Sequence, residues 1–217
     1  MVDPISLPAV GWRGCTFDPV QPRDVNRMEG RRTESQSFGT PYWTAKYQAM
    51  WLNNAKFGLM DAFIMQAGDD GETFLGYDVF RPRPVAMDTG LPLSGTKAGG
   101  GAFNGDGFIQ AITGGVLVAV GGLPAGFILS PGDYVELRMS ALKRSLHRVV
   151  TAAVADAGGY VTLNVRYPVD TQHFNTTATV HFEKPSCTMQ IDAGSYEGSK
   201  SWDSREPSFS ATEVFVS

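Results

Sequence analysis

The chain has 217 residues, of which 42% are hydrophobic and 18% are charged, and it contains 25 glycines and 13 prolines. This length can bury a sizeable core, and abundant glycine and proline without a short repeat is typical of an all-β chain with many turns. The formal net charge is −4 and no run of like charge exceeds two residues, which argues against a nucleic-acid groove.

The sequence gives no sign of secretion or of membrane insertion. The opening residues, Met1-Val-Asp-Pro-Ile-Ser-Leu-Pro, lack the basic start and apolar core of a secretion signal. The most apolar stretch, 114–129, is too short and too broken by glycine and proline to cross a bilayer. Cys15 and Cys187 have no metal-type spacing and are expected to be buried and reduced, with a disulfide left open as the alternative.

In the first part of the chain the sequence predicts strands. Residues 5–17 are expected to form an opening strand pair, followed by a proline-marked turn at 18–22, and residues 31–38 suit an exposed or edge strand. Residues 42–51 alternate clearly and predict a half-buried strand. The side chains expected on one face of that strand are Trp43, Ala45, Tyr47, Ala49 and Trp51.

One helix is predicted after this strand. Asn53 can cap it, Leu52 and Phe57 occupy the two positions of a hydrophobic staple, and Gly68 follows its last turn. The apolar residues expected on its buried side are Phe57, Met60, Ile64 and Ala67. A strand at 74–80 should follow, ended by Pro82 and Pro84, and the glycine-rich residues 91–107 predict a mobile connection or extended loop.

The second half of the chain predicts a meander of strands that closes into a small barrel. Apolar runs within 123–137, 146–150 and 155–165 are separated by Pro-Gly or Gly-Gly breaks, which supply the φ values of tight reversals. Pro131 and Gly132 suit the two central positions of a type II turn. Two last strands are expected at 186–193 and 208–216, with a polar loop between them.

This order of elements resembles the distal tail and baseplate hub proteins of long-tailed, siphovirus-type bacteriophages. The resemblance is carried by Tyr42-Trp43-Thr44-Ala45 before one short helix, by Arg81-Pro-Arg-Pro, and by Ser130-Pro-Gly-Asp-Tyr-Val with His147-Arg-Val in the barrel. It implies a mainly β fold, with a ring-forming β-sandwich and one helix in residues 1–95 and 183–217. Residues 96–182 would be an inserted small β-barrel.

The same resemblance implies a structural role without catalysis. The chain would form a ring with copies of itself, most simply a hexamer, that joins the tail tube protein to baseplate hub and tail fibre proteins. The protein would be assembled in the host cytoplasm and end at the tail tip of the virion, with no membrane contact and with DNA only passing through the lumen. No catalytic, cofactor-binding or metal-binding residue is expected.

A carbohydrate-binding module and a hydrolase are the two alternative classes of function. A carbohydrate-binding β-domain for host-surface attachment would use exposed aromatics such as Trp12, Tyr196 and Trp202 to stack on sugars. A hydrolase would need a paired acid or a nucleophile set, which the sequence does not display. The glycine-rich Gly99-Gly-Gly-Ala-Phe-Asn-Gly-Asp-Gly lacks the Lys-Ser/Thr pair of a phosphate loop.

The remaining polar residues are all better explained by structural roles than by catalysis or metal binding. Asp69, Asp70 and Glu72 fall short of a calcium loop and predict a solvated turn. His147, His173 and His181 are scattered, with His147 expected to be a packed or surface residue, and Asp133 is expected to stabilise its turn. Two arginine groups could form ion pairs with a neighbouring subunit or simply lie at exposed strand ends: Arg31 with Arg32, and Arg81 with Arg83.

Overall fold

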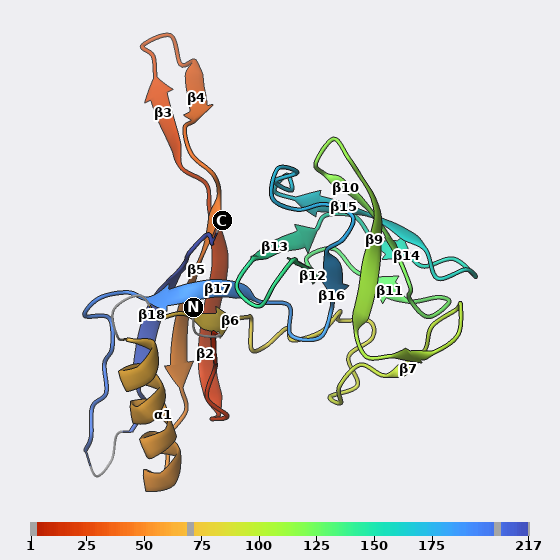
Figure 1. The fold of residues 1–217 in the computed structure, drawn as a ribbon. Helices are drawn as coiled ribbons and strands as arrows, with labels where there is room; N and C mark the ends of the chain where they lie inside the picture. Colours follow the sequence, from red (N-terminus) through yellow and green to blue (C-terminus); the bar gives the residue numbers. More distant parts are fainter. Residues whose placement is uncertain (1–3, 69–71, 202–204, 217) are drawn as a thin grey trace. The chain divides into compact units, whose positions relative to one another are not determined.

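The computed structural model describes residues 4–68, 72–201 and 205–216, and the chain divides into two compact units. The first unit contains Met1–Leu7, Asp70–Thr188 and Phe215–Ser217; the second contains Pro8–Asp69 and Met189–Val214. Strands predominate, and one helix is present in the described ranges (Figure 1). The predicted mainly β fold class, with one short helix and a small barrel, is therefore confirmed.

The second unit is built on antiparallel strands in the order β17 (Cys187–Ile191), β18 (Ser208–Glu213), β5 (Tyr42–Ala49) and β2 (Trp12–Val20). The alternation predicted for β5 is confirmed, because Trp43, Ala45, Tyr47 and Ala49 are all buried. Trp51 was wrongly assigned to this face. It lies beyond the end of β5 and is 52% exposed, since the strand stops before the chain turns toward the helix.

The helix α1 (Asn54–Ala67) begins and ends as predicted. The Asn53 side chain accepts a hydrogen bond from the backbone N–H of Lys56 at 2.9 Å, and both staple residues, Leu52 and Phe57, are buried. The buried stripe passes through Phe63 rather than the predicted Ile64. The Phe63 ring lies 5.7 Å from that of Phe209 on β18, so the larger aromatic side chain covers the sheet.

The start of the chain differs from the prediction. No hairpin forms within residues 5–17: β1 (Ile5–Ser6) pairs in parallel with β6 (Phe74–Gly76), whereas β2 pairs with β5. The turn expected at 18–22 is also wrong, because β2 continues through Pro19 to Val20. Proline is tolerated there because β2 is an outer strand, where a missing N–H need not break the ladder. The strand expected at 74–80 is confined to β6.

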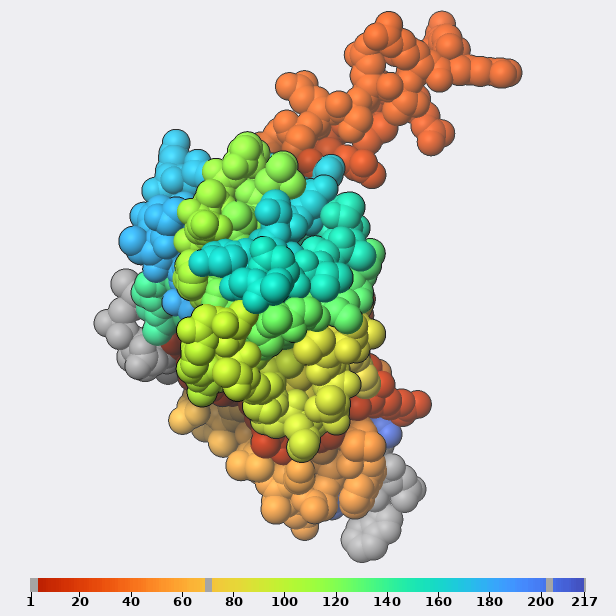
Figure 2. Space-filling view, turned by 90° about the vertical axis from the view of Figure 1, so that its right-hand side faces the viewer, coloured from red at the N-terminus to blue at the C-terminus, as the bar shows by residue number. Residues whose placement is uncertain are grey.

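Beyond β2 and β5 the chain forms a hairpin that we call the arm, residues 23–37. It consists of β3 (Arg23–Arg27) and β4 (Thr33–Ser37), paired antiparallel from Arg23 with Ser37 to Arg27 with Thr33. Every residue of both strands is exposed, as expected for the strand at 31–38. In the space-filling view the arm is a narrow projection at the red-orange end of the colour scale (Figure 2).

The first unit contains the predicted barrel. Its closed strand order is β10 (Leu117–Gly121), β15 (Val161–Arg166), β13 (Arg144–Val149), β12 (Tyr134–Arg138), β16 (Thr179–His181) and β9 (Asp106–Thr113). The interior is filled by side chains, as is usual for small barrels. The largest residues of this core that are fully buried are Leu123, Phe127, Leu129, Leu137, Leu163 and Phe182.

Two short strand pairs accompany the barrel: β11 (Ile128–Leu129) with β14 (Ala153–Val154), and the hairpin of β7 (Gly95–Thr96) with β8 (Ala102–Phe103). The second lies in the glycine-rich residues that were expected to form a mobile or extended loop. Gly100 and Gly101 have φ of 90° and 91°, and the Gly101 carbonyl accepts from the Lys97 N–H at 3.0 Å. Glycine thus closes a tight reversal here, because it reaches positive φ without steric cost.

All six barrel strands lie within the expected insertion, 96–182, but the compact unit also includes residues 70–95 and 183–188. These flanks are tied to the barrel: Asp133 accepts from the N–H of Val85 at 3.1 Å, and Glu136 on β12 accepts from the N–H of Ser186 at 2.9 Å. The division into a folded insertion and a folded remainder stays a prediction. In the described ranges no helix is long and apolar enough to cross a membrane.

Gly132 closes the predicted turn before β12. Its φ is 86° and the Asp133 N–H donates to the Ser130 carbonyl at 3.0 Å. A Cβ at this position would lie 3.0 Å from Nη1 of Arg81. We expect Gly132→Val to lower the free energy of unfolding by about 1–3 kcal/mol, through backbone strain at positive φ and the close contact with Arg81. Urea unfolding followed by far-UV circular dichroism measures this change.

The matched control is Gly99→Val. Gly99 has no positive φ, and no atom lies within 4 Å of the added Cβ, so its unfolding should stay near wild type. Equal midpoints for the two variants would contradict the turn assignment.

Candidate functional site

The residues considered for metal binding do not form a site in the described ranges. Asp69 and Asp70 lie outside these ranges, so Glu72 is the one described residue of the three. Across residues 4–68, 72–201 and 205–216, no three His, Cys, Asp or Glu side chains are grouped as metal ligands would be. Cys187 is fully buried and Cys15 is half-buried.

The three histidines lie in separate places. His147 is buried; its Nδ1 donates to the carbonyl oxygen of Tyr167 at 2.9 Å and its Nε2 accepts from the Ser145 hydroxyl at 2.8 Å. Burial lowers the pKa of His147 to about 4, so the ring is neutral at physiological pH. His173 contacts Asp170 at 2.6 Å, and His181 contacts Asp106. His147 is thus packed, as predicted.

The aromatic residues considered for sugar stacking are occupied within the chain. The Trp12 ring lies 5.4 Å from Tyr47 and 6.3 Å from Phe209, and it is half-buried against the sheet. The Tyr196 hydroxyl donates to Oδ1 of Asp61 at 2.9 Å. Trp202 lies outside the described residues.

Arg81 and Arg83 pair within their own unit. Arg83 donates to Glu183 through Nη2 at 2.7 Å and Nε at 2.8 Å, and Nη1 reaches Asp88 at 3.2 Å. Its side chain is only 9% exposed. These bonds raise the pKa of Arg83 above its usual value. An exposed strand end is therefore the wrong description of Arg83, whose charge is matched inside the unit.

Asp133 has the structural role that its turn predicts. Its side chain is buried; Oδ2 accepts from the Ser130 N–H at 2.7 Å and Oδ1 from the Val85 N–H at 3.1 Å. Nη2 of Arg81 lies 3.6 Å from Oδ1. A buried carboxylate needs such partners, because its desolvation is otherwise costly.

A second buried carboxylate, Glu136 on β12, organises the most polar part of the barrel unit. Its Oε1 accepts from Nη1 of Arg144 at 2.6 Å and from Nε of Arg138 at 2.8 Å. Its Oε2 accepts from the N–H of Ser186 at 2.9 Å and from the Ser186 hydroxyl at 3.2 Å. The Glu136 side chain is fully buried, and Arg144 is 7% exposed. Burial is the main reason that the pKa of Arg144 is lowered.

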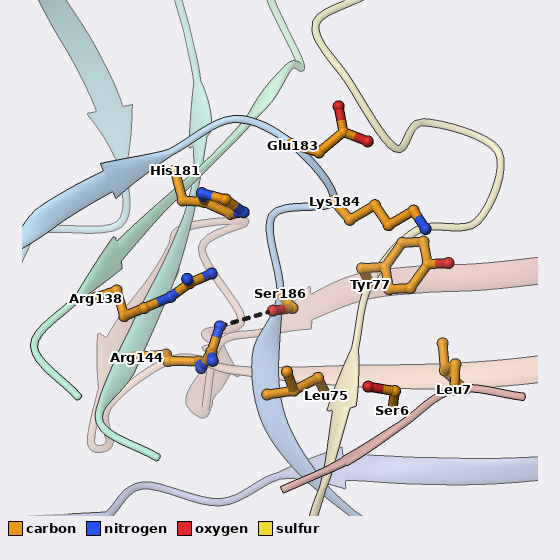
Figure 3. A pocket seen from close by; sticks show the side chains of 10 residues that line it. All are labelled: Ser6, Leu7, Leu75, Tyr77, Arg138, Arg144, His181, Glu183, Lys184 and Ser186. Atoms are coloured by element: carbon orange, nitrogen blue, oxygen red, sulfur yellow. Dashed lines mark hydrogen bonds between the residues drawn. The ribbon is translucent and has the colours of Figure 1, made fainter. Parts of the chain in front are cut away.

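These two arginines border a pocket of about 380 Å³ in the first unit (Figure 3). Both guanidinium groups point into it from β12 and β13, and Lys184 lies on another side with its Nζ 5.9 Å from the centre of the Tyr77 ring. Apolar lining comes from Leu7 and Leu75. This pocket was not predicted from the sequence. The charged residues of β12, two apart between apolar neighbours, were the available signal.

The arm has two chemically different faces. Because side chains alternate along strands, Asp24, Asn26, Glu34 and Gln36 share one face, and Arg23, Val25, Arg27, Thr33, Ser35 and Ser37 share the other. The first face bears carboxylates and amides beside a hollow of about 620 Å³. The second bears two arginines among small hydroxyl side chains. Arg32 lies 3.7 Å from Glu34, but both side chains are more than half exposed.

No protein-family model matches the chain, and no curated protein matches it significantly.

Proposed function

We propose that the chain is a structural subunit of a bacteriophage tail tip, and that it forms a ring with copies of itself between the tail tube and the hub and fibre proteins. The observation that carries the self-association is the arm. An isolated two-stranded hairpin is at best marginally stable in water, and this one has ten strand residues that are all exposed. A second chain can provide the contacts that the arm lacks.

The charges of the arm favour a head-to-tail arrangement. Asp24 and Glu34 lie on one face, and Arg23 and Arg27 on the other. The acidic face of one copy is therefore complementary to the basic face of the next. Identical subunits joined through two different surfaces form a ring when their rotation closes. A ring of six, proposed from the resemblance, is compatible with this contact.

Native mass spectrometry at low ionic strength tests the proposal. We expect a hexamer, with a population that falls as salt is added, because exposed charges are screened within about 8 Å at physiological ionic strength. A chain that stays monomeric at every concentration, or forms only a two-fold dimer, would contradict a head-to-tail ring.

Charge reversal tests the arm itself. Arg23→Glu with Arg27→Glu makes both faces acidic, and Asp24→Lys with Glu34→Lys makes both faces basic. Each variant alone should remain monomeric, because like faces repel. An equimolar mixture should restore even-numbered rings with alternating copies. Lys46→Glu, on the exposed side of β5, is the control and should assemble as wild type. Failure of the mixture to assemble would remove the arm from the interface.

A further inference from the structure

We propose that the pocket bordered by Arg138 and Arg144 binds an oxyanion, a carboxylate or a phosphate group, held between the two guanidinium groups. All ten residues that line this pocket belong to the first compact unit. The site is independent of the ring proposed above, because neither the arm nor any other part of the second unit contributes to it.

Two positive charges face each other across neighbouring strands at this pocket. Arg138 on β12 and Arg144 on β13 are direct cross-strand partners. Like charges in that position destabilise a sheet unless an anion lies between them. Glu136, two residues before Arg138, supplies one negative charge from the buried side. One carboxylate cannot neutralise two guanidinium groups, so one positive charge remains.

The two guanidinium groups also carry more N–H donors than Glu136 can accept. Glu136 already accepts four hydrogen bonds, two at each oxygen. A guanidinium group carries five N–H donors. Arg138 uses Nε for Glu136. Arg144 uses Nη1 for Glu136 and for the Ser186 hydroxyl at 3.4 Å, and Nε for the Ala141 carbonyl at 2.6 Å. Among the described residues, Nη1 and Nη2 of Arg138 and Nη2 of Arg144 have no protein acceptor, and both guanidinium groups point into the pocket (Figure 3).

The other lining residues do not cancel the positive charge of the two arginines. Lys184 is exposed and adds a positive charge, with its ammonium over the Tyr77 ring. The carboxylate of Glu183 accepts hydrogen bonds from Arg83 and from the N–H of Leu93, the latter at 2.8 Å. His181 is hydrogen-bonded to Asp106. The pocket therefore has an excess of positive charge, and its 380 Å³ lies within the range of small-ligand sites.

These features select the chemistry of the ligand. Guanidinium groups bind planar carboxylates and phosphates through paired N–H donors, and such charge-assisted bonds are the strong ones. Leu7 and Leu75 provide an apolar wall for a short carbon chain beside the anionic group. Lys184 is placed for a second negative charge on the same ligand.

Titration with two probes, inorganic phosphate and succinate, tests the site by NMR. The signals followed are the Nε–H groups of Arg138 and Arg144 and the backbone amide of Ser186. We expect saturable shifts with at least one probe: phosphate alone would assign a phosphate site, and succinate alone a carboxylate site. No saturable shift with either probe would overturn the proposal.

Three variants localise the binding. Arg138→Gln should weaken it about tenfold, the loss expected for one charge-assisted hydrogen bond. Lys184→Gln, at an exposed position, should weaken it about threefold. Lys143→Gln removes the same charge from the β12–β13 connection outside the pocket and should leave binding unchanged. Equal weakening by Lys143→Gln and Lys184→Gln would show that only general charge matters and would contradict a built site.

Discussion

Replacing Glu136 by Gln is expected to destabilise the protein by about 3–5 kcal/mol, the cost of leaving a buried cation without its partner. Arg144 is almost fully buried and depends on this carboxylate. The glutamine amide can still offer one oxygen to the two arginines, but its NH₂ group then faces the N–H and hydroxyl of Ser186, where two acceptor sites are required. Chemical denaturation at neutral pH measures the loss.

The control is Glu206→Gln at the surface. Glu206 accepts from Arg13 at 2.6 Å, but the Arg13 side chain is 62% exposed, so this loss should cost less than about 1 kcal/mol. A Glu136→Gln variant no less stable than Glu206→Gln would refute the account of Glu136 as the organising charge of the barrel unit.

The second unit should lose stability as the pH rises, because of Glu213 at the end of β18. Glu213 accepts from the Trp43 N–H at 2.9 Å, but burial dominates and raises its pKa to about 7. Between the unfolded pKa of 4.5 and about 7, the folded chain keeps a proton that the unfolded chain releases. The stabilisation is complete below pH 4.5 and falls by roughly 3 kcal/mol up to pH 7. Glu213→Gln should abolish this dependence.

The stability of the barrel unit should instead increase as the pH rises, because of His147. Its pKa is about 4 when folded and 6.5 as a model value, so the unfolded chain binds the extra proton in that window. Stability of this unit should therefore rise from pH 4 to pH 6.5, also by roughly 3 kcal/mol. His147→Gln keeps a donor for the Tyr167 carbonyl and should remove the effect.

Hydrogen exchange at pH 5 and pH 7, corrected for intrinsic rates, separates the two responses. Amides of β5 and β18 should be better protected at pH 5, and those of β13 and β15 at pH 7. If protection in both units changes in the same direction, at least one of the two titrating groups has been assigned wrongly.

The features predicted correctly are those encoded by neighbouring residues. The helix was defined by Asn53, Leu52 and Phe57, and the type II turn by Pro131 and Gly132, because caps and turns depend on groups a few residues apart. The alternation of β5 was equally local. Residue type alone did not choose between Phe63 and Ile64, because both are apolar, although they point about 100° apart around the helix.

The features that were missed depend on long-range pairing. Nothing near Ile5 specifies a parallel partner at Phe74, and nothing near Glu136 specifies Ser186, fifty residues later. The arm was half predicted for the same reason. Its exposed second strand was expected, but no element was predicted for Arg23–Arg27, which follow the proline-marked turn expected at 18–22.

Because the arm is fully exposed, selection for the stability of the single chain and selection for assembly act on its residues separately, whereas elsewhere they usually act together. Side chains at Arg23, Asp24, Arg27 and Glu34 pack against no core, so most exchanges there leave the melting temperature of the single chain unchanged. A screen based on thermal stability would record such exchanges as silent. If the chain forms the proposed ring, their effect would be visible only in co-assembly, where one altered copy limits every ring that it enters.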